Sequence, residues 1–159
     1  DYIEILVPPK PNRAHILSFL NKLFSYNAVS KKKDINCVFE YISQLRSKKV
    51  AVCLISDFMD KIDRSKIALA IQKHEIIAFR CLDSQEIKFA DAGFLLCQDS
   101  ETLQQINLDS SSSYINDSLN RWYKEQNDIF KSFSIDYLDI KTHESFISNL
   151  VRFLKRTII

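Results

Sequence analysis

Glycine is almost absent from this sequence, which has one glycine in 159 residues where a share of about 7% is usual. The chain therefore lacks the residues from which a glycine-rich phosphate-binding loop is built. A surplus of charge is also missing, because 22 Lys and Arg face 20 Asp and Glu. Nothing in the overall charge calls for a nucleic acid or a membrane as partner.

Cysteine pairs with metal-binding spacing are lacking too. The four cysteines, Cys37, Cys53, Cys81 and Cys97, lie far apart and form no CxxC motif. Such cysteines are typical of small buried apolar side chains in a reducing compartment. No apolar run approaches the roughly 20 residues of a membrane span, and no basic, then apolar, leader opens the chain. We therefore expect a cytoplasmic location and no membrane span.

What is present indicates an ordinary globular domain. A hydrophobic content of 46% over 159 residues fits one domain, residues 1–159. The chain starts with Asp1 and not with a methionine, which suggests a fragment or a processed piece.

The first third of the chain predicts a strand and two helices. Residues 2–7 alternate weakly and end at prolines, so we expect a short strand near a sheet edge. Asn12 can cap a helix that ends near Tyr26 and packs on the core. Asp34 can cap a second helix that ends before the basic residues 46–49.

The run "VAVCLISDFMD", residues 50–60, predicts a strand that ends at an acid. Residues 50–55 show no polar alternation, which is typical of a parallel strand covered on both faces. A helix over residues 64–73 and a buried strand over 75–82 follow. Strand, helix and strand at this spacing predict a βαβ unit.

The period changes to two after Gly93. Residues 94–98 and 103–108 predict a β-hairpin inserted between parallel strands. Serines 110–113 can cap a helix that continues to Phe133, residues 135–140 predict the last strand, and Thr142 can cap a closing helix. The sequence thus predicts an α/β fold with three layers, a mostly parallel sheet and one inserted hairpin.

Few residues carry the signature of a reactive site. Asp57 and Asp60 stand where an acid ends a parallel strand, as in some phosphoryl-transfer sites, but no DxD pair accompanies them. His15, His74 and His143 are scattered, and we expect His74 to lie at a helix end. Lysines 31–33 and Trp122 are better explained as a solvated loop and a core residue than as a nucleic-acid site.

The order of motifs resembles one bacterial family, catalogued as domain of unknown function 58, which is von Willebrand factor A-like. The stretches that carry the resemblance cover nearly the whole chain: "EILVPPKPNRAHILSFLNKLF", "VAVCLISDFMD", "KHEIIAFRCLDSQE", "FADAGFLLCQDSET" and "FSIDYLDIKTHESFISNLVRFLKR". The resemblance implies a Rossmann-like von Willebrand factor A-like domain, of which this chain is the carboxyl-terminal portion without the first strands.

The resemblance also implies a metal-ion-dependent adhesion site at the carboxyl ends of the strands. Complete members place there a DxSxS motif, a Thr before a helix, and an Asp that corresponds to Asp57. Hydroxyl and carboxylate oxygens suit Mg²⁺. This chain has no DxSxS motif, and Lys33 stands at the Thr position. Asp57 is therefore the one candidate metal ligand, and we expect a Mg²⁺ ion only if a DxSxS segment lies upstream.

The function that the resemblance implies is a non-enzymatic protein-interaction module that works with a MoxR-type AAA+ ATPase in complex maturation. A hydrolase or phosphotransferase that uses Asp57 is the alternative. If the family topology holds, the absent strands leave the strand at residues 50–55 as an exposed apolar edge. We therefore expect that residues 1–159 do not behave as a stable monomer.

Overall fold

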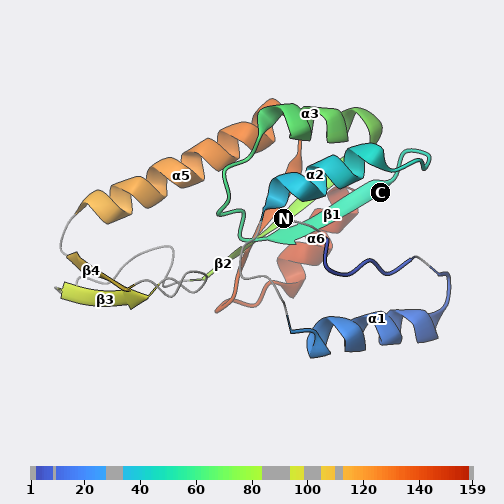
Figure 1. The fold of residues 1–159 in the computed structure, drawn as a ribbon, viewed down its shortest axis with the longest axis horizontal. Helices are drawn as coiled ribbons and strands as arrows, with labels where there is room; N and C mark the ends of the chain where they lie inside the picture. The colour runs from blue at the N-terminus through green and yellow to red at the C-terminus, as the bar shows by residue number, and fades with distance from the viewer. Residues whose placement is uncertain are drawn as a thin grey trace.

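The computed structural model describes residues 3–8, 10–27, 34–83, 94–98, 105–109 and 113–157. The elements within them, labelled as in Figure 1, are α1 Arg13–Ser25, α2 Ile35–Gln44, β1 Ala51–Ser56, α3 Arg64–Lys73, β2 Glu75–Leu82, β3 Phe94–Gln98, β4 Gln105–Asp109, α5 Ser113–Ser132, β5 Asp136–Lys141 and α6 Ile147–Thr157. Helices and strands alternate through most of the chain.

The main sheet has three strands in the order β1-β2-β5. Both pairs are parallel, with Cys53 opposite Ile77 and Phe79 opposite Leu138. The central strand β2 is apolar over most of its length and almost wholly buried, as expected for a parallel strand that helices cover on both faces. The predicted α/β class and the parallel β1–α3–β2 unit are confirmed.

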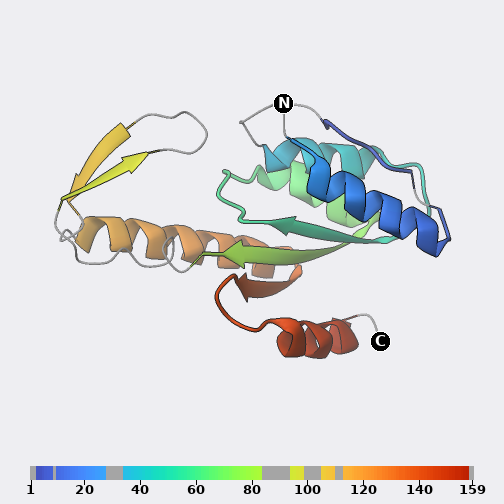
Figure 2. The same ribbon diagram turned by 90° about the horizontal axis from the view of Figure 1, so that it is seen from below.

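Helices lie on both faces of this sheet (Figure 2). Ile76 and Ala78 of β2 pack in the cluster that includes residues of α2, α3 and α5, whereas Ile77 and Phe79 pack against Phe153 of α6. Successive residues of a strand point to opposite faces, so this alternation divides the core into two layers. The larger layer lies on the α2 and α3 side.

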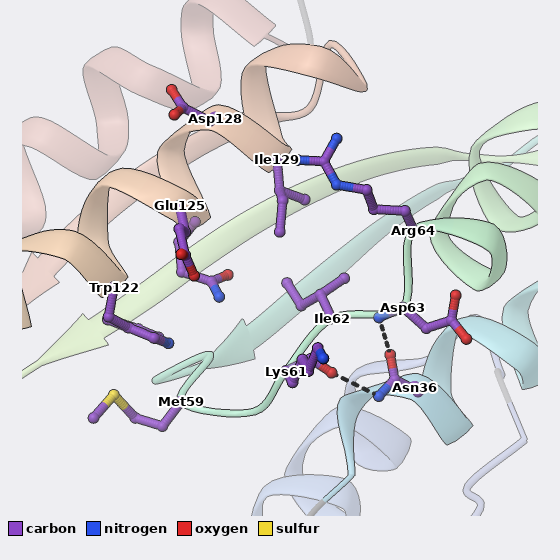
Figure 3. Close-up of a pocket in the computed structure, with 11 residues that line it drawn as sticks. Asn36, Met59, Lys61, Ile62, Asp63, Arg64, Trp122, Glu125, Asp128 and Ile129 are labelled. Carbon is purple, nitrogen blue, oxygen red and sulfur yellow. Dashed lines mark hydrogen bonds between the residues drawn. The ribbon is translucent and has the colours of Figure 1, made fainter. Parts of the chain in front are cut away.

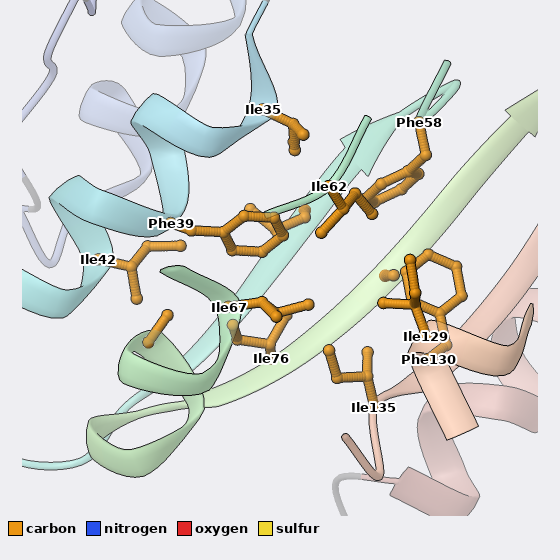
Figure 4. Packing of buried hydrophobic residues seen from close by; sticks show 13 residues of the cluster. Ile35, Phe39, Ile42, Phe58, Ile62, Ile67, Ile76, Ile129, Phe130 and Ile135 are labelled. Carbon is orange, nitrogen blue, oxygen red and sulfur yellow. The ribbon is translucent and has the colours of Figure 1, made fainter. Parts of the chain in front are cut away.

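Aromatic and β-branched side chains fill the larger layer (Figure 4). Phe39, Phe58, Ile67 and Phe130 are at most 1% exposed. The rings of Phe58 and Phe130 meet edge to face with centroids 5.2 Å apart. Each such side chain contributes roughly 1.5–3 kcal/mol when it leaves water, so this cluster is a main source of stability.

Side-chain caps set where three helices begin. Asn12 accepts a hydrogen bond from the backbone N–H of His15, Asp34 from that of Asn36, and Asp63 from that of Ser65. Each cap satisfies an N–H group that the first helical turn leaves without a partner. The predicted caps Asn12 and Asp34 are confirmed.

The strand β1 is less buried than its sequence predicts. Leu54 is its one buried residue, and the side chain of Ile55 is 73% exposed. Cys53 and Ile55 stand opposite Ile77 and Phe79 on the face where α6 packs, but Phe153 of α6 packs on β2 and leaves this face of β1 exposed among the described residues. Within those residues β1 is also the edge strand of the sheet. The prediction of cover on both faces is wrong, whereas the expected exposed apolar edge is observed.

The amino-terminal region also departs from expectation. Residues 3–7 form no strand, and α1 has no buried residue although it is helical as predicted. Its apolar side chains are exposed, with Leu17 at 63% and Phe24 at 84%. A strand needs a paired neighbour and an amphipathic helix needs a surface to cover, and the described residues supply neither here.

Two later predictions differ from the structure in detail. The strands β3 and β4 pair antiparallel in a separate two-stranded sheet, but residues 99–104 between them lie outside the described residues, so the inserted hairpin stays a prediction. Thr142 does not cap α6, which begins at Ile147. Its backbone N–H bonds the carbonyl of Leu82 at 3.0 Å instead and extends the contact of β2 with β5.

Candidate functional site at the carboxyl edge of the sheet

The carboxyl ends of the parallel strands form the edge where ligands bind in open α/β sheets. Asp57 follows β1 directly, Asp83 follows β2, and Thr142 follows β5. The hydroxyl of Thr142 donates to the Asp83 carboxylate at 3.2 Å. The structure therefore places the predicted residue Asp57 at the expected edge.

Local hydrogen bonds hold the Asp57 carboxylate. Its Oδ1 accepts from the backbone N–H of Met59 at 3.2 Å and from the Ser56 hydroxyl at 3.4 Å. A bond from Asp to the N–H two residues later is typical of turns that end a strand. Asp57 is half-buried, and its carboxylate shapes the turn at the strand end.

Phe58 fixes the conformation of this turn. Its φ angle is 54°, a left-handed value that is uncommon for a bulky residue. The ring is fully buried, and the Phe58 N–H donates to the Ser56 hydroxyl at 3.0 Å. Burial of the ring compensates the backbone strain, so Asp57 is held in one position at the strand end.

The loop after Phe58 is tied to the start of α2. Asp60 Oδ2 accepts from the N–H of Ile35 at 3.1 Å. Asn36 donates to the carbonyl of Lys61 at 2.9 Å and accepts from the N–H of Asp63 at 2.7 Å. Asp60 therefore adds a side-chain acceptor for the first N–H group of α2, beside the cap Asp34. These bonds place the start of α2 beside the loop that follows Phe58.

Burial and the charge of Asp57 both affect the pKa of Cys81 on the neighbouring strand β2. Burial raises the pKa of the Cys81 thiol, and the negative charge of Asp57 raises it further. Both effects keep the thiol protonated, and the thiolate is the form that attacks or binds metal. Cys81 is consequently a weak candidate for either role.

The described residues do not complete a metal site around Asp57. Across those ranges no group of three His, Cys, Asp or Glu side chains is placed to hold an ion. Lys33, which stands at the Thr position of the resemblance, lies outside the described residues. One half-buried carboxylate is too few ligands for Mg²⁺, so the described residues alone do not fit this ion.

The three histidines are not brought together. His74 is 1% exposed, ends α3 as predicted, and its Nδ1 accepts from the N–H of Val50 at 3.4 Å. His143 is exposed and lies 3.5 Å from Glu144, and His15 is in α1. The histidines of the described chain form no catalytic triad.

Sequence reasoning missed a buried arginine on the central strand that pairs with a carboxylate of β5. Arg80 is 2% exposed, and its Nε and Nη2 each donate to Asp139 at 2.8 Å. Nη2 also donates to Asn127 at 3.0 Å, and the rings of Tyr123 and Tyr137 flank the guanidinium. The signal was a single arginine inside the apolar strand "EIIAFRCL".

A cavity of about 1010 Å³ was also not predicted. It lies beside the loop that follows Asp57, and α5 forms its other wall (Figure 3). Trp122, predicted to be a core residue, is half-buried and lines this cavity. The sequence could have shown the apolar stripe of α5 but not the loop opposite it.

One family model matches most of the chain. The family model described as "Protein of unknown function DUF58" matches residues 1–129. The chain therefore belongs to the DUF58 family. Neither the curated proteins nor the solved structures that were compared with it give a match. No helix in the described ranges has the length and apolar character that a membrane crossing requires.

Proposed function

We propose that this chain is part of a non-enzymatic protein-interaction module with a von Willebrand factor A-like fold. The observation that carries the proposal is the position of Asp57 at the carboxyl edge of a parallel sheet, in a turn held by the buried ring of Phe58. A rigid carboxylate at this edge suits binding of a partner through polar groups. No cofactor enters the proposal for this chain by itself.

The partner we propose is a MoxR-type AAA+ ATPase, in a role in complex maturation. Membership of the DUF58 family supports this choice through the resemblance described above. The setting we propose is the cytoplasm, because unpaired cysteines suit a reducing compartment. Cys37, Cys53 and Cys81 are free thiols in the structure.

An enzyme that uses Asp57 is the competing function. A nucleophilic carboxylate needs an approach path and a partner group that activates it or its substrate. The Asp57 Oδ1 already accepts two local hydrogen bonds, which favours a positioning role over attack.

A phosphatase assay on the whole natural protein separates the two functions. We expect no hydrolysis of p-nitrophenyl phosphate above the buffer rate, with or without Mg²⁺. The matched control is Asp57→Ala. Hydrolysis that the wild type shows and Asp57→Ala lacks would overturn the proposal in favour of the enzyme.

Mg²⁺ titration by calorimetry is the second arm of this test. Heat of binding that Asp57→Ala abolishes would show that ligands outside the described residues complete a metal site. Binding of Mg²⁺ without turnover agrees with an interaction module.

A further inference from the structure

The cavity between α5 and the loop over residues 59–63 has two unlike walls. On α5, Trp122, Glu125, Gln126 and Ile129 recur at helical spacing and share one face. The loop contributes Met59, Lys61, Ile62 and Asp63, and Arg64 at the start of α3 completes this wall. Figure 3 shows Trp122 of α5 and Met59 of the loop at the same end of the cavity. The volume of about 1010 Å³ can hold several residues of a peptide.

Gln126 is the unusual member of this wall. It is 3% exposed, and its Oε1 has no hydrogen-bond donor among the described residues. A buried acceptor without a partner costs about 1–3 kcal/mol. The last torsion of a glutamine side chain is broad, so a small rotation can turn the amide into the cavity that Gln126 lines. A ligand with an N–H donor would then satisfy it.

The charges of the cavity favour a cation. Three carboxylates, those of Asp63, Glu125 and Asp128, outnumber the two cations of Lys61 and Arg64. Lys61 is on the loop and Arg64 begins α3, whereas Glu125 and Asp128 are on α5 beside Gln126. Figure 3 shows the Arg64 side chain extending toward Ile129 of α5, so a cationic donor is best placed at the other end of the α5 wall, near Glu125 and Trp122.

We propose that this cavity binds an arginine side chain presented by a partner protein. The guanidinium donates to the Gln126 amide oxygen and to the Glu125 carboxylate, and its planar face and stem pack on Trp122 and Met59. Arginine suits the site better than lysine, because it has several donors in a plane and stacks on aromatic rings. The protein already holds Arg80 in this way, between a carboxylate, an amide oxygen and aromatic rings.

The inference rests on the proposed interaction function only in taking a protein as the partner. Its proposed contacts to Gln126 and Glu125 are on α5 and not at the Asp57 carboxylate, so the two proposals can fail separately. Because the Met59 N–H donates to Asp57 Oδ1, the cavity is tested by variants of the α5 wall and not by Asp57→Ala.

The fluorescence of Trp122 reports directly on the cavity, since this is the one tryptophan in the sequence. The probe is a capped pentapeptide with one arginine between alanines, and the matched peptide carries methionine in its place. We expect a saturable change in Trp122 emission with the arginine peptide. The methionine peptide should bind at least roughly tenfold more weakly, because it has no charged donor.

Variants of the wall separate binding from folding. Gln126→Met should weaken binding of the arginine peptide roughly tenfold without lowering thermal stability, because Gln126 Oε1 has no donor among the described residues. Glu125→Gln should weaken it as well, and Gln72→Met, on the exposed surface of α3, should change nothing. Equal binding of the two peptides, no response of Trp122 at millimolar peptide, or a destabilised Gln126→Met with unchanged affinity would each overturn the proposal.

Discussion

Arg80 is the residue that most constrains the interior of this protein. A charged group that is 2% exposed is stable only when its donors are satisfied. Asp139 and Asn127 accept from Nε and Nη2, whereas Nη1 has no acceptor in the described part of the chain. The pair joins β2 to β5 and to α5, so its geometry specifies how these three elements meet.

Removal of the Asp139 carboxylate tests this constraint. Asp139→Ala leaves the Arg80 charge buried with one remaining acceptor, and we expect the free energy of unfolding to fall by about 2 kcal/mol. That is less than the roughly 3–5 kcal/mol of a fully buried pair, because Asp139 is 37% exposed. Urea denaturation followed by circular dichroism measures the change.

Asp136→Ala on the same strand is the matched control. Asp136 is 53% exposed and lies 3.8 Å from Arg156, and such surface pairs contribute about 0–1 kcal/mol. Equal losses of stability in the two variants would show that Arg80 does not depend on Asp139.

At the scale of elements, α3 has a cap that responds to pH. Hydrogen bonds from the Ser65 hydroxyl and backbone N–H lower the pKa of Asp63 below its ordinary value of 3.8. The charged form is therefore favoured in the folded state. Its contribution to stability is fully present above pH 3.8 and is lost as the pH falls through the lower pKa of the folded protein.

Asp63→Asn tests this dependence, because asparagine still caps a helix but does not titrate. We expect the wild type to be more stable than Asp63→Asn at neutral pH, and the difference to shrink as the pH falls below 3.8. Thermal unfolding across a pH series measures it. A difference that stays constant down to the acid limit would contradict the assigned cause.

The elements that the sequence predicted well are those whose signals are local. Helix α3 follows the cap Asp63, and β2 follows His74, so both elements have the predicted bounds Arg64–Lys73 and Glu75–Leu82. The signal that placed Asp57 at a strand end was also local, because the apolar run of residues 50–55 stops just before it. Local hydrogen bonds and periodicity were sufficient for these features.

The features that the sequence did not predict depend on residues far apart in the chain. The apolar stripe of α1 suggested a core helix. The stripe itself does not show whether another part of the protein packs against it, and α1 has no buried residue. Thr142 was predicted to cap a helix, yet its backbone N–H bonds the carbonyl of Leu82 and extends the pairing of β2 with β5. The cavity beside Gln126 forms between α5 and a loop some sixty residues earlier in the chain. No pattern in a single sequence predicts that these two segments lie side by side.

At the scale of the whole molecule, the edge strand β1 is the element that we expect to drive self-association. Ile55 is 73% exposed on a strand that pairs along one side within the described residues. An exposed apolar edge strand is a template for pairing with another chain. We expect residues 1–159 alone to self-associate as concentration rises, which sedimentation velocity measures.

Ile55→Lys is expected to reduce this association, because a charge on an edge strand disfavours pairing. Leu69→Lys is the matched control, since Leu69 is 54% exposed on α3, away from the edge. A chain that stays monomeric at all concentrations, or equal effects of the two substitutions, would contradict the role assigned to β1.

Binding of a MoxR-type ATPase to the whole natural protein tests the central claim most directly. The affinity of the wild type is compared with those of Asp57→Ala and of the surface control Asp136→Ala by biolayer interferometry. We predict that Asp57→Ala weakens binding roughly tenfold or more, the effect of losing a charged contact, while Asp136→Ala binds as the wild type does. Equal affinity of wild type and Asp57→Ala would contradict the claim that the carboxyl edge at Asp57 is the partner surface.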